Sequence, residues 1–278
     1  MAKIRELEAK IKRPVILLWH GGRTKDKFAY LNFVNYLVFA KNIRKLKDGK
    51  KVAVVIHSPG GDARAAFKLA CLLRKHCGGF IAVVPLFAKS AATLFALGAE
   101  KIIISRFAEL GPLDVQVEDP EKEERFSALE VVQAIERLNS EAIQAVDQQM
   151  LFWLNRSGKK VDTLFPITTH FVSELMRPLF EKIDTVNYTG MARILKVAQD
   201  YAQRLLEKAG LGPKEAEIIA DKLTNAYSEH EYVLDYDELR RIGIKNVEEA
   251  KGDLANILED MVFMGSDSIM LGPFEEIK

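Results

Sequence analysis

Short apolar runs rich in valine, isoleucine and leucine alternate with amphipathic stretches in the N-terminal part of this chain. Four such runs have the length and composition of buried strands: residues 14–19, 51–57, 80–87 and 101–105. Apolar residues at helical spacing follow the second run, over residues 63–76, and a short alanine-rich helix is expected at residues 90–97. This alternation predicts an α/β fold with a parallel sheet and right-handed crossover helices.

The second half of the chain has a different character, because long helical patterns replace the strand pattern. Helices are expected at residues 127–155, 191–209, 213–227 and 247–264. Ser127 followed by Glu130 resembles a capping box at the start of the first of these helices. Two short strands are expected near residues 232–234 and 268–271. We therefore expect a single domain over residues 1–278, with a core of about residues 1–125 and a helical extension of about residues 126–278 that returns as a strand and a helix.

Composition and charge exclude several classes of protein. The 278 residues contain 40 Lys and Arg against 39 Asp and Glu, so a net charge of +1 gives no overall attraction to nucleic acid. Two cysteines, Cys71 and Cys77, cannot build a disulfide framework, and neither has the spacing of a metal site. No apolar run reaches the roughly 18–20 residues that span a bilayer, and the first residues do not form a signal peptide. These features predict a cytoplasmic protein with no integral membrane segment, no cofactor, no metal and no nucleic-acid partner.

Two segments at the carboxyl ends of predicted strands carry candidate chemistry, because ligand sites of open α/β sheets form there. The first is residues 57–62, His-Ser-Pro-Gly-Gly-Asp. Its two glycines let backbone N–H groups face outward near a helix N-terminus, which suits the binding of an oxyanion. The alternative is an ordinary strand-to-helix turn.

The second segment is residues 88–93, Ala-Lys-Ser-Ala-Ala-Thr. A serine displayed as a nucleophile on a sharp strand-to-helix turn needs small residues two positions to either side, and Ala88 and Ala92 meet that need around Ser90. Ser90 also fits the role of a helix N-cap. Together, the two segments would supply a nucleophile and a pocket for negative charge on neighbouring loops.

The order of these motifs resembles a known group of proteases. The sequences SPGG, AKSAATLFALGAEKI and AELGPLD follow one another as in the Clp protease proteolytic subunits and signal peptide peptidase A, and the chain looks most like the serine dehydrogenase proteinase family within that group. The resemblance is strong over about residues 14–120 and continues more weakly through YSEHEYVLDYDELRRIGI to Ile244. It implies a Clp/crotonase-like fold of repeated β-β-α units and a serine peptidase that needs no ATP.

The resemblance also implies roles for single residues and a partner. Ser90 would be the nucleophile, and the backbone N–H groups of Gly61 and Ala91 would form the oxyanion hole. Members of the group assemble into rings, so a homo-oligomer that acts on polypeptide substrates is implied. Some relatives are membrane-anchored, and this chain would make at most a peripheral membrane contact.

The general base is the least determined part of the prediction. Clp subunits have a histidine about 25 residues after the serine, but the matching stretch here, residues 110–114, has none. His230 lies on the C-terminal segment of the resemblance and is our first choice, because a neutral imidazole is the best base near pH 7. Asp114 would orient it as the third member of a triad. Lys182 and His57 stay open as alternative bases, whereas Lys89 is expected to diverge from its neighbour Ser90.

Three other functions remain open at this stage. One is a catalytically inactive protein of the same fold that serves as a scaffold or binding protein. Another is an enzyme that acts on acyl-CoA thioesters, in which the backbone pocket would hold an enolate. The third is an esterase of the α/β-hydrolase class, since the order Ser90, Asp114, His230 suits that class, although its GxSxG signature is only approximated.

Overall fold

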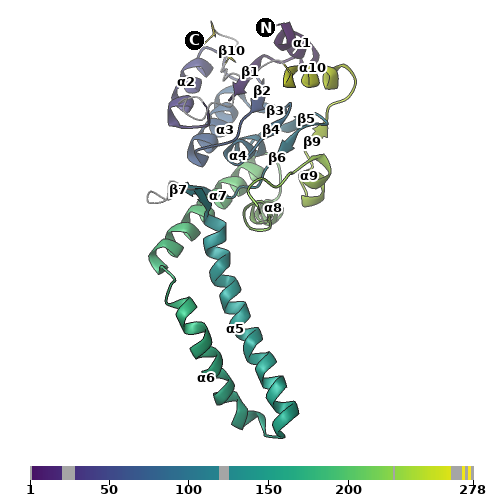
Figure 1. Ribbon diagram of the computed structural model, residues 1–278. Helices are drawn as coiled ribbons and strands as arrows, with labels where there is room; N and C mark the ends of the chain where they lie inside the picture. Colours follow the sequence, from purple (N-terminus) through teal and green to yellow (C-terminus); the bar gives the residue numbers. More distant parts are fainter. Residues whose placement is uncertain are drawn as a thin grey trace. The chain divides into compact units, whose positions relative to one another are not determined.

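A five-stranded parallel sheet organises the fold (Figure 1). A computed structural model describes residues 2–20, 29–118, 125–227, 229–263, 271–272 and 275–276. The sheet has the order β1-β2-β3-β5-β9 and consists of β1 (Val15–Trp19), β2 (Val52–His57), β3 (Phe80–Val84), β5 (Lys101–Ile104) and β9 (Val247–Glu249). The predicted α/β class with a parallel sheet is confirmed.

The two faces of the sheet are both buried, which explains why its strands are continuously apolar. One face, which includes Val54, Ala82 and Ile102, packs against α2 (Phe33–Ile43), α3 (Ala63–Cys77), α4 (Ala91–Leu97), the C-terminal part of α7 (Thr185–Lys208), α8 (Pro213–Asn225) and α9 (Tyr236–Ile242). The other face, which includes Val55 and Val83, packs against α1 (Ala2–Ile11) and α10 (Asp253–Val262). Helices therefore cover the sheet on both sides.

The strand β9 corrects the predicted helix over residues 247–264. Val247 is buried and pairs with Ile102 of β5, so the segment begins as a strand at the edge of the sheet. Gly252 has a φ of 57° and separates this strand from α10, which begins at Asp253. Val247 and Ala250 continue the helical spacing of the apolar residues Leu254, Leu258 and Met261, which is why the pattern suggests one continuous helix.

Three other predicted elements differ from the structure. The run at residues 80–87 is divided at Pro85, which cannot donate a ladder hydrogen bond, into β3 and the short strand β4 (Phe87–Ala88). Near residues 232–234 only Leu234 forms a bridge, to Leu110. The strand predicted at residues 268–271 lies almost wholly outside the described residues, and Leu271 belongs to β10 (Leu271–Gly272), which pairs with β11 (Glu275–Glu276).

A row of short backbone pairings lies beyond the carboxyl ends of the central strands. Ala88 of β4 pairs with Ser58 and with Leu110 of β6 (Glu109–Leu110), and Leu110 in turn bridges to Leu234. This row joins four segments that are separate in sequence. It is the layer on which the candidate site is built.

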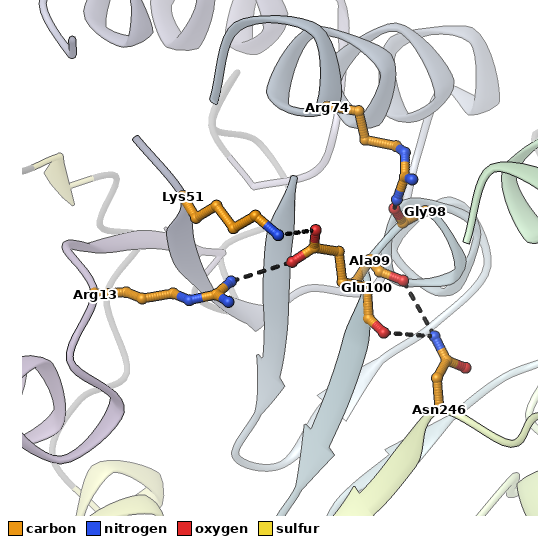
Figure 2. Close-up of polar contacts among 7 residues, drawn as sticks. All are labelled: Arg13, Lys51, Arg74, Gly98, Ala99, Glu100 and Asn246. Atoms are coloured by element: carbon orange, nitrogen blue, oxygen red, sulfur yellow. Dashed lines mark hydrogen bonds and ion pairs between the residues drawn. The ribbon is translucent and has the colours of Figure 1, made fainter. Parts of the chain in front are cut away.

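Polar contacts at the start of β5 bind the C-terminal segment that leads into β9 (Figure 2). The Asn246 side chain donates to the carbonyl oxygens of Ala99 at 3.1 Å and Glu100 at 3.4 Å. Glu100 in turn receives hydrogen bonds from Lys51 at 2.6 Å and Arg13 at 3.4 Å. These contacts hold Asn246, directly before β9, against the first half of the chain.

The described chain divides into two compact units, residues 1–114 with 197–278 and residues 115–196. The second unit contains β7 (Gln116–Glu118), β8 (Arg125–Ser127), α5 (Ala128–Ser157), α6 (Val161–Phe180) and the first part of α7. Figure 1 shows α5 and α6 running side by side. Ser127 caps α5 as expected, because its hydroxyl accepts hydrogen bonds from the N–H groups of Leu129 at 3.0 Å and Glu130 at 3.2 Å. The single-domain description of the chain stays a prediction.

Sequence patterns did not predict α6, which contains Pro166 and Pro178. Proline inside a helix removes a backbone donor and normally argues against a helix. Here the hydroxyl of Thr169 donates to the carbonyl oxygens of Phe165 at 2.9 Å and Pro166 at 3.1 Å. Across the described part of the chain, no helix combines the length and the apolar character needed to cross a membrane.

Candidate active site

Ser90 has a strained backbone at the junction of β4 and α4. Its φ of 49° and ψ of −118° lie in a region that residues with a side chain rarely adopt. Ser90 occupies the N-cap position of α4, but its hydroxyl makes no capping hydrogen bond. The hydroxyl is therefore not used to stabilise the helix, and the strain is of the kind found where a turn displays a reactive side chain.

The Gly60–Gly61 turn lies directly against Ser90. A Cβ atom placed on Gly60 would lie 2.9 Å from the Cβ of Ser90 and 3.0 Å from the backbone nitrogen of Ala91. Both glycines have positive φ values, 108° for Gly60 and 132° for Gly61. The two segments that sequence reasoning paired are thus in contact, and only glycine permits this approach.

Two backbone donors of this region are unused. Within the described residues, the N–H groups of Gly61 and Ala91 donate no hydrogen bond. The N–H of Gly60, in contrast, donates to the hydroxyl of Ser58 at 3.1 Å. Free N–H groups beside a strained serine are the arrangement that stabilises an oxyanion in acyl transfer.

Ser58 and His20 hold the glycine turn through hydrogen bonds. Ser58 is fully buried, and its Oγ lies 2.7 Å from Nδ1 of the buried His20. If Ser58 donates its proton to His20, it can accept the Gly60 N–H at the same time, so both of its roles are satisfied. Sequence reasoning missed this support; the serine of the SPGG motif was the signal that pointed to it.

Two histidines next to the turn, the buried His20 and the partly buried His57, resist protonation. Burial lowers the pKa of His20 to about 4, with a smaller contribution from the nearby His57. Burial also lowers the pKa of His57 to about 4. The His57 ring packs between Trp19 and Phe87, with centroid separations of 4.2 and 4.0 Å.

Acidification is expected to destabilise the fold through His20. In the unfolded chain a histidine binds a proton below about pH 6.5, whereas folded His20 does so only below about pH 4, so stability is full above pH 6.5 and is lost as the pH falls toward 4. Between pH 6.5 and pH 4 this residue should remove about 3 kcal/mol of unfolding free energy. Urea unfolding from pH 7 to pH 4 measures the loss. Because His57 has the same shift, His20→Asn should remove about half of the pH dependence and His170→Asn on exposed α6 none of it, and an unchanged profile in His20→Asn would contradict the assignment.

The structure brings Asp114 and His230 together. Nδ1 of His230 lies 3.8 Å from Oδ2 of Asp114, too far for a direct hydrogen bond but within reach of a small ring movement. The Asp114 side chain is 5% exposed and that of His230 is 22% exposed. A buried carboxylate beside a partly accessible imidazole is the arrangement that orients a general base.

A single backbone bridge brings the two segments together. Leu110 and Leu234 exchange two hydrogen bonds of 2.9 and 3.0 Å in an isolated antiparallel bridge. Asp114 follows Leu110 by four residues and His230 precedes Leu234 by four, so both residues lie within a short stretch of chain from this bridge.

The side chain of Lys89 points away from Ser90, as expected, and connects neighbouring segments of the site. Its buried ammonium lies 2.8 Å from Oε1 of Glu109 and donates to the carbonyl oxygen of Tyr232 at 3.4 Å. Lys89 therefore connects the nucleophile loop, β6 and the segment that carries His230. This positioning contact is not visible in the sequence, because it depends on the long-range bridge at Leu234.

The other candidate residues lie elsewhere. Lys182 is exposed and follows α6 in the second unit. In the described part of the chain, Ser90 makes no side-chain hydrogen bond to His230, and the two segments are connected through the contact of Lys89 with the carbonyl oxygen of Tyr232. Among these same described residues, no group of three or more histidine, cysteine or acidic side chains has the geometry of a metal site.

Known protein families and individual proteins are similar to this chain. Residues 3–183 match a family described as ClpP-like SDH-type serine proteinase. Two proteins of Methanocaldococcus jannaschii are similar in sequence. The uncharacterized protein MJ1495 is 24% identical over 250 residues, which are 87% of this chain and 69% of that protein. The uncharacterized protein MJ0137 is 30% identical over 153 residues, which are 53% of this chain and 51% of that protein, so the match spans about half the length of MJ0137.

Solved structures with a similar arrangement have low sequence identity. A mutant of the 1510-N membrane-bound stomatin-specific protease is 12% identical, with a TM-score of 0.46, and the match covers 80% of this chain and 76% of that one. ClpP1 from Listeria monocytogenes is also 12% identical, with a TM-score of 0.44 and coverage of 90% and 99%.

Proposed function

This chain belongs to the family of ClpP-like SDH-type serine proteinases, and from that membership we propose that it cleaves polypeptides through an acyl-enzyme on Ser90. The observation that carries the proposal is the strained backbone of Ser90, packed against the Gly60–Gly61 turn. The strained backbone conformation of Ser90 costs about 1–3 kcal/mol of stability, and no capping hydrogen bond of its side chain offsets that cost. Residues strained in this way cluster at active sites.

In the proposed mechanism His230 accepts the proton of the Ser90 hydroxyl while the oxygen attacks the carbonyl carbon of the scissile peptide bond. The negative charge that develops on the carbonyl oxygen is held by the N–H groups of Gly61 and Ala91. His230 then returns the proton to the departing amine as the C–N bond breaks. Water, activated by the same imidazole, hydrolyses the ester and regenerates Ser90.

Asp114 would hold the imidazole in the tautomer that can accept the Ser90 proton. Its carboxylate already lies on the Nδ1 side of His230, which leaves Nε2 for the serine. A shift of less than 1 Å would turn the 3.8 Å separation into a hydrogen bond, and catalytic hydrogen bonds commonly tighten only when substrate binds.

The finer features of the activity follow the family resemblance. We propose endopeptidase cleavage without ATP, no cofactor, a homo-oligomeric assembly and a cytoplasmic location. The 3.8 Å gap between Asp114 and His230 gives a specific reason to test a second function, a catalytically inactive scaffold of the same fold.

A fluorophosphonate probe tests the proposal directly. The folded protein should become covalently labelled, and peptide mapping should place the label on Ser90. Ser90→Ala should remain unlabelled, as should wild-type protein unfolded in urea. Absence of Ser90-dependent labelling would overturn the peptidase and favour the scaffold. If labelling occurs, turnover of acyl-CoA or simple esters without turnover of peptides would exclude a peptidase and identify one of the other acyl-transfer enzymes.

A further inference from the structure

Ser58 is bonded to both loops of the candidate site at once. Its carbonyl oxygen accepts the backbone N–H of Lys89, the residue directly before Ser90, at 2.9 Å. Its side-chain Oγ accepts the N–H of Gly60, the residue directly before Gly61, at 3.1 Å. One residue therefore connects the loop of the proposed nucleophile with the turn of the proposed oxyanion hole.

The direction of the Gly61 N–H depends on two successive peptide planes. The carbonyl oxygen of Gly60 accepts the N–H of Leu31 at 2.6 Å, and in a trans peptide the N–H that follows points the opposite way. The preceding plane carries the Gly60 N–H, which Ser58 holds. Because glycine rotates easily between backbone conformations, loss of either contact would let the Gly61 N–H turn away from Ser90.

His20 determines where the Ser58 hydroxyl points. Nδ1 of His20 lies 2.7 Å from Oγ of Ser58, and both side chains are buried. Within the described residues, Nε2 of His20 makes no hydrogen bond, so Ser58 is the one side-chain partner of this imidazole there. A hydroxyl that donates to Nδ1 keeps its lone pairs for the Gly60 N–H. An apolar side chain at position 20 would leave the hydroxyl without this acceptor.

We propose that Ser58 and His20 are positioning residues that hold the oxyanion turn in register with Ser90. His20 acts on Ser58, Ser58 acts on Gly60, and neither side chain contacts the substrate. The inference deepens the proposed function and rests on it. Both residues should affect the transition state more than the bound ground state, because the turn contacts a charge that develops only during the reaction.

Saturation kinetics of fluorophosphonate labelling test this role of Ser58. Ser58→Ala should lower the maximal labelling rate about 30-fold, because misplacement of a reacting group by about 1 Å costs up to 10²-fold. The affinity for the probe should stay within about twofold of wild type. A loss of affinity with an unchanged maximal rate would overturn the proposal.

Ser105 offers a matched control for the loss of a buried hydroxyl. Its side chain is also buried, and its Oγ also accepts the N–H of the residue two positions on, Phe107, at 3.0 Å. Ser105→Ala therefore removes the same kind of contact outside the turn. Its maximal labelling rate should stay within about twofold of wild type. An equal loss in Ser105→Ala and Ser58→Ala would show a general effect of stability and would overturn the proposal.

Substitutions of His20 test whether it acts through Ser58. His20→Leu should lower the maximal rate about tenfold, whereas His20→Asn should stay within about threefold of wild type, because its amide oxygen can accept the Ser58 hydroxyl. The double variant His20→Leu with Ser58→Ala should label no more slowly than Ser58→Ala alone. Multiplied losses in the double variant, or a His20→Asn variant as slow as His20→Leu, would overturn the proposal.

Hydrogen exchange of the Gly60 amide separates this inference from the proposed function, since it does not require a reactive Ser90. Measured by NMR, exchange should be at least about tenfold faster in Ser58→Ala and unchanged in Ser105→Ala. A wild-type protein that is never labelled would refute the peptidase, and with it the catalytic role of the turn. Unchanged exchange at Gly60 in Ser58→Ala would instead refute the hold of Ser58 on the turn, whatever the protein catalyses.

Discussion

His230→Ala is expected to slow the acylation of Ser90 by about 10³-fold, within the range that a positioned general base contributes. The hydroxyl of Ser90 is a weak nucleophile unless a neighbouring group accepts its proton. His230 is the histidine that the structure sets beside the buried carboxylate of Asp114. The measurement is the second-order rate constant for fluorophosphonate labelling of the folded variant and wild type.

Two further readouts separate a base from a structural residue. Added imidazole should partly restore labelling of His230→Ala, because a small base can occupy the vacated space. The alternative base Lys182 and the exposed His170 provide controls, since Lys182→Ala and His170→Ala should label at wild-type rates within about twofold. A His230→Ala rate within threefold of wild type, or a large loss in Lys182→Ala, would contradict the assignment of His230.

Gly61→Ala is expected to lower the unfolding free energy by about 4 kcal/mol, which is at the upper end for a point substitution. A Cβ on Gly61 would lie 2.1 Å from the carbonyl oxygen and 2.9 Å from the nitrogen of Leu31, both backbone atoms that cannot swing away. Leu31 also holds the turn through hydrogen bonds with Gly60 at 2.6 Å and Asp62 at 2.9 Å. The new methyl group must therefore displace the turn, and probe labelling of Ser90 should fall with it.

Gly49→Ala provides a matched control for this change. Gly49 also has a positive φ, 76°, but a Cβ there would meet no atom within 4 Å. The unfolding free energy of this variant should fall by only about 1–2 kcal/mol, which is the cost of placing a residue with a Cβ in a left-handed backbone conformation. Urea unfolding compares the two variants, with the same dependence of unfolding free energy on urea concentration used for both. Equal losses at Gly49 and Gly61 would show that contact with Leu31 is unimportant and would contradict the prediction.

The sequence predicted the parts of the fold that follow from local patterns. Four of the five strands of the parallel sheet were found because burial on both faces makes them continuously apolar. The edge strand β9 was missed because a short strand followed by an apolar helix resembles a longer helix. Helix α6 was missed because its two prolines argue against a helix, although the Thr169 hydroxyl bonds carbonyl groups near Pro166.

The candidate site divides in the same way. Ser90 and Gly61 could be selected from the sequence because nucleophile and oxyanion turns have local requirements for small residues. The backbone strain at Ser90 and the unused N–H groups of Gly61 and Ala91 are visible only in three dimensions. His230 and Asp114 were chosen by resemblance, and their proximity depends on the bridge between Leu110 and Leu234. Lys89 and His20 support the site through contacts that no local pattern reveals.

The position of His230 on the returning segment has a consequence for synthesis of the protein. The nucleophile loop and the oxyanion turn are complete once the first third of the chain has been made, but the strand that fixes the returning segment, β9, begins only at Val247. A nascent chain would therefore hold Ser90 without its proposed base until His230 and β9 have been synthesised. Such an order would delay hydrolytic competence well beyond the point at which the nucleophile loop is made.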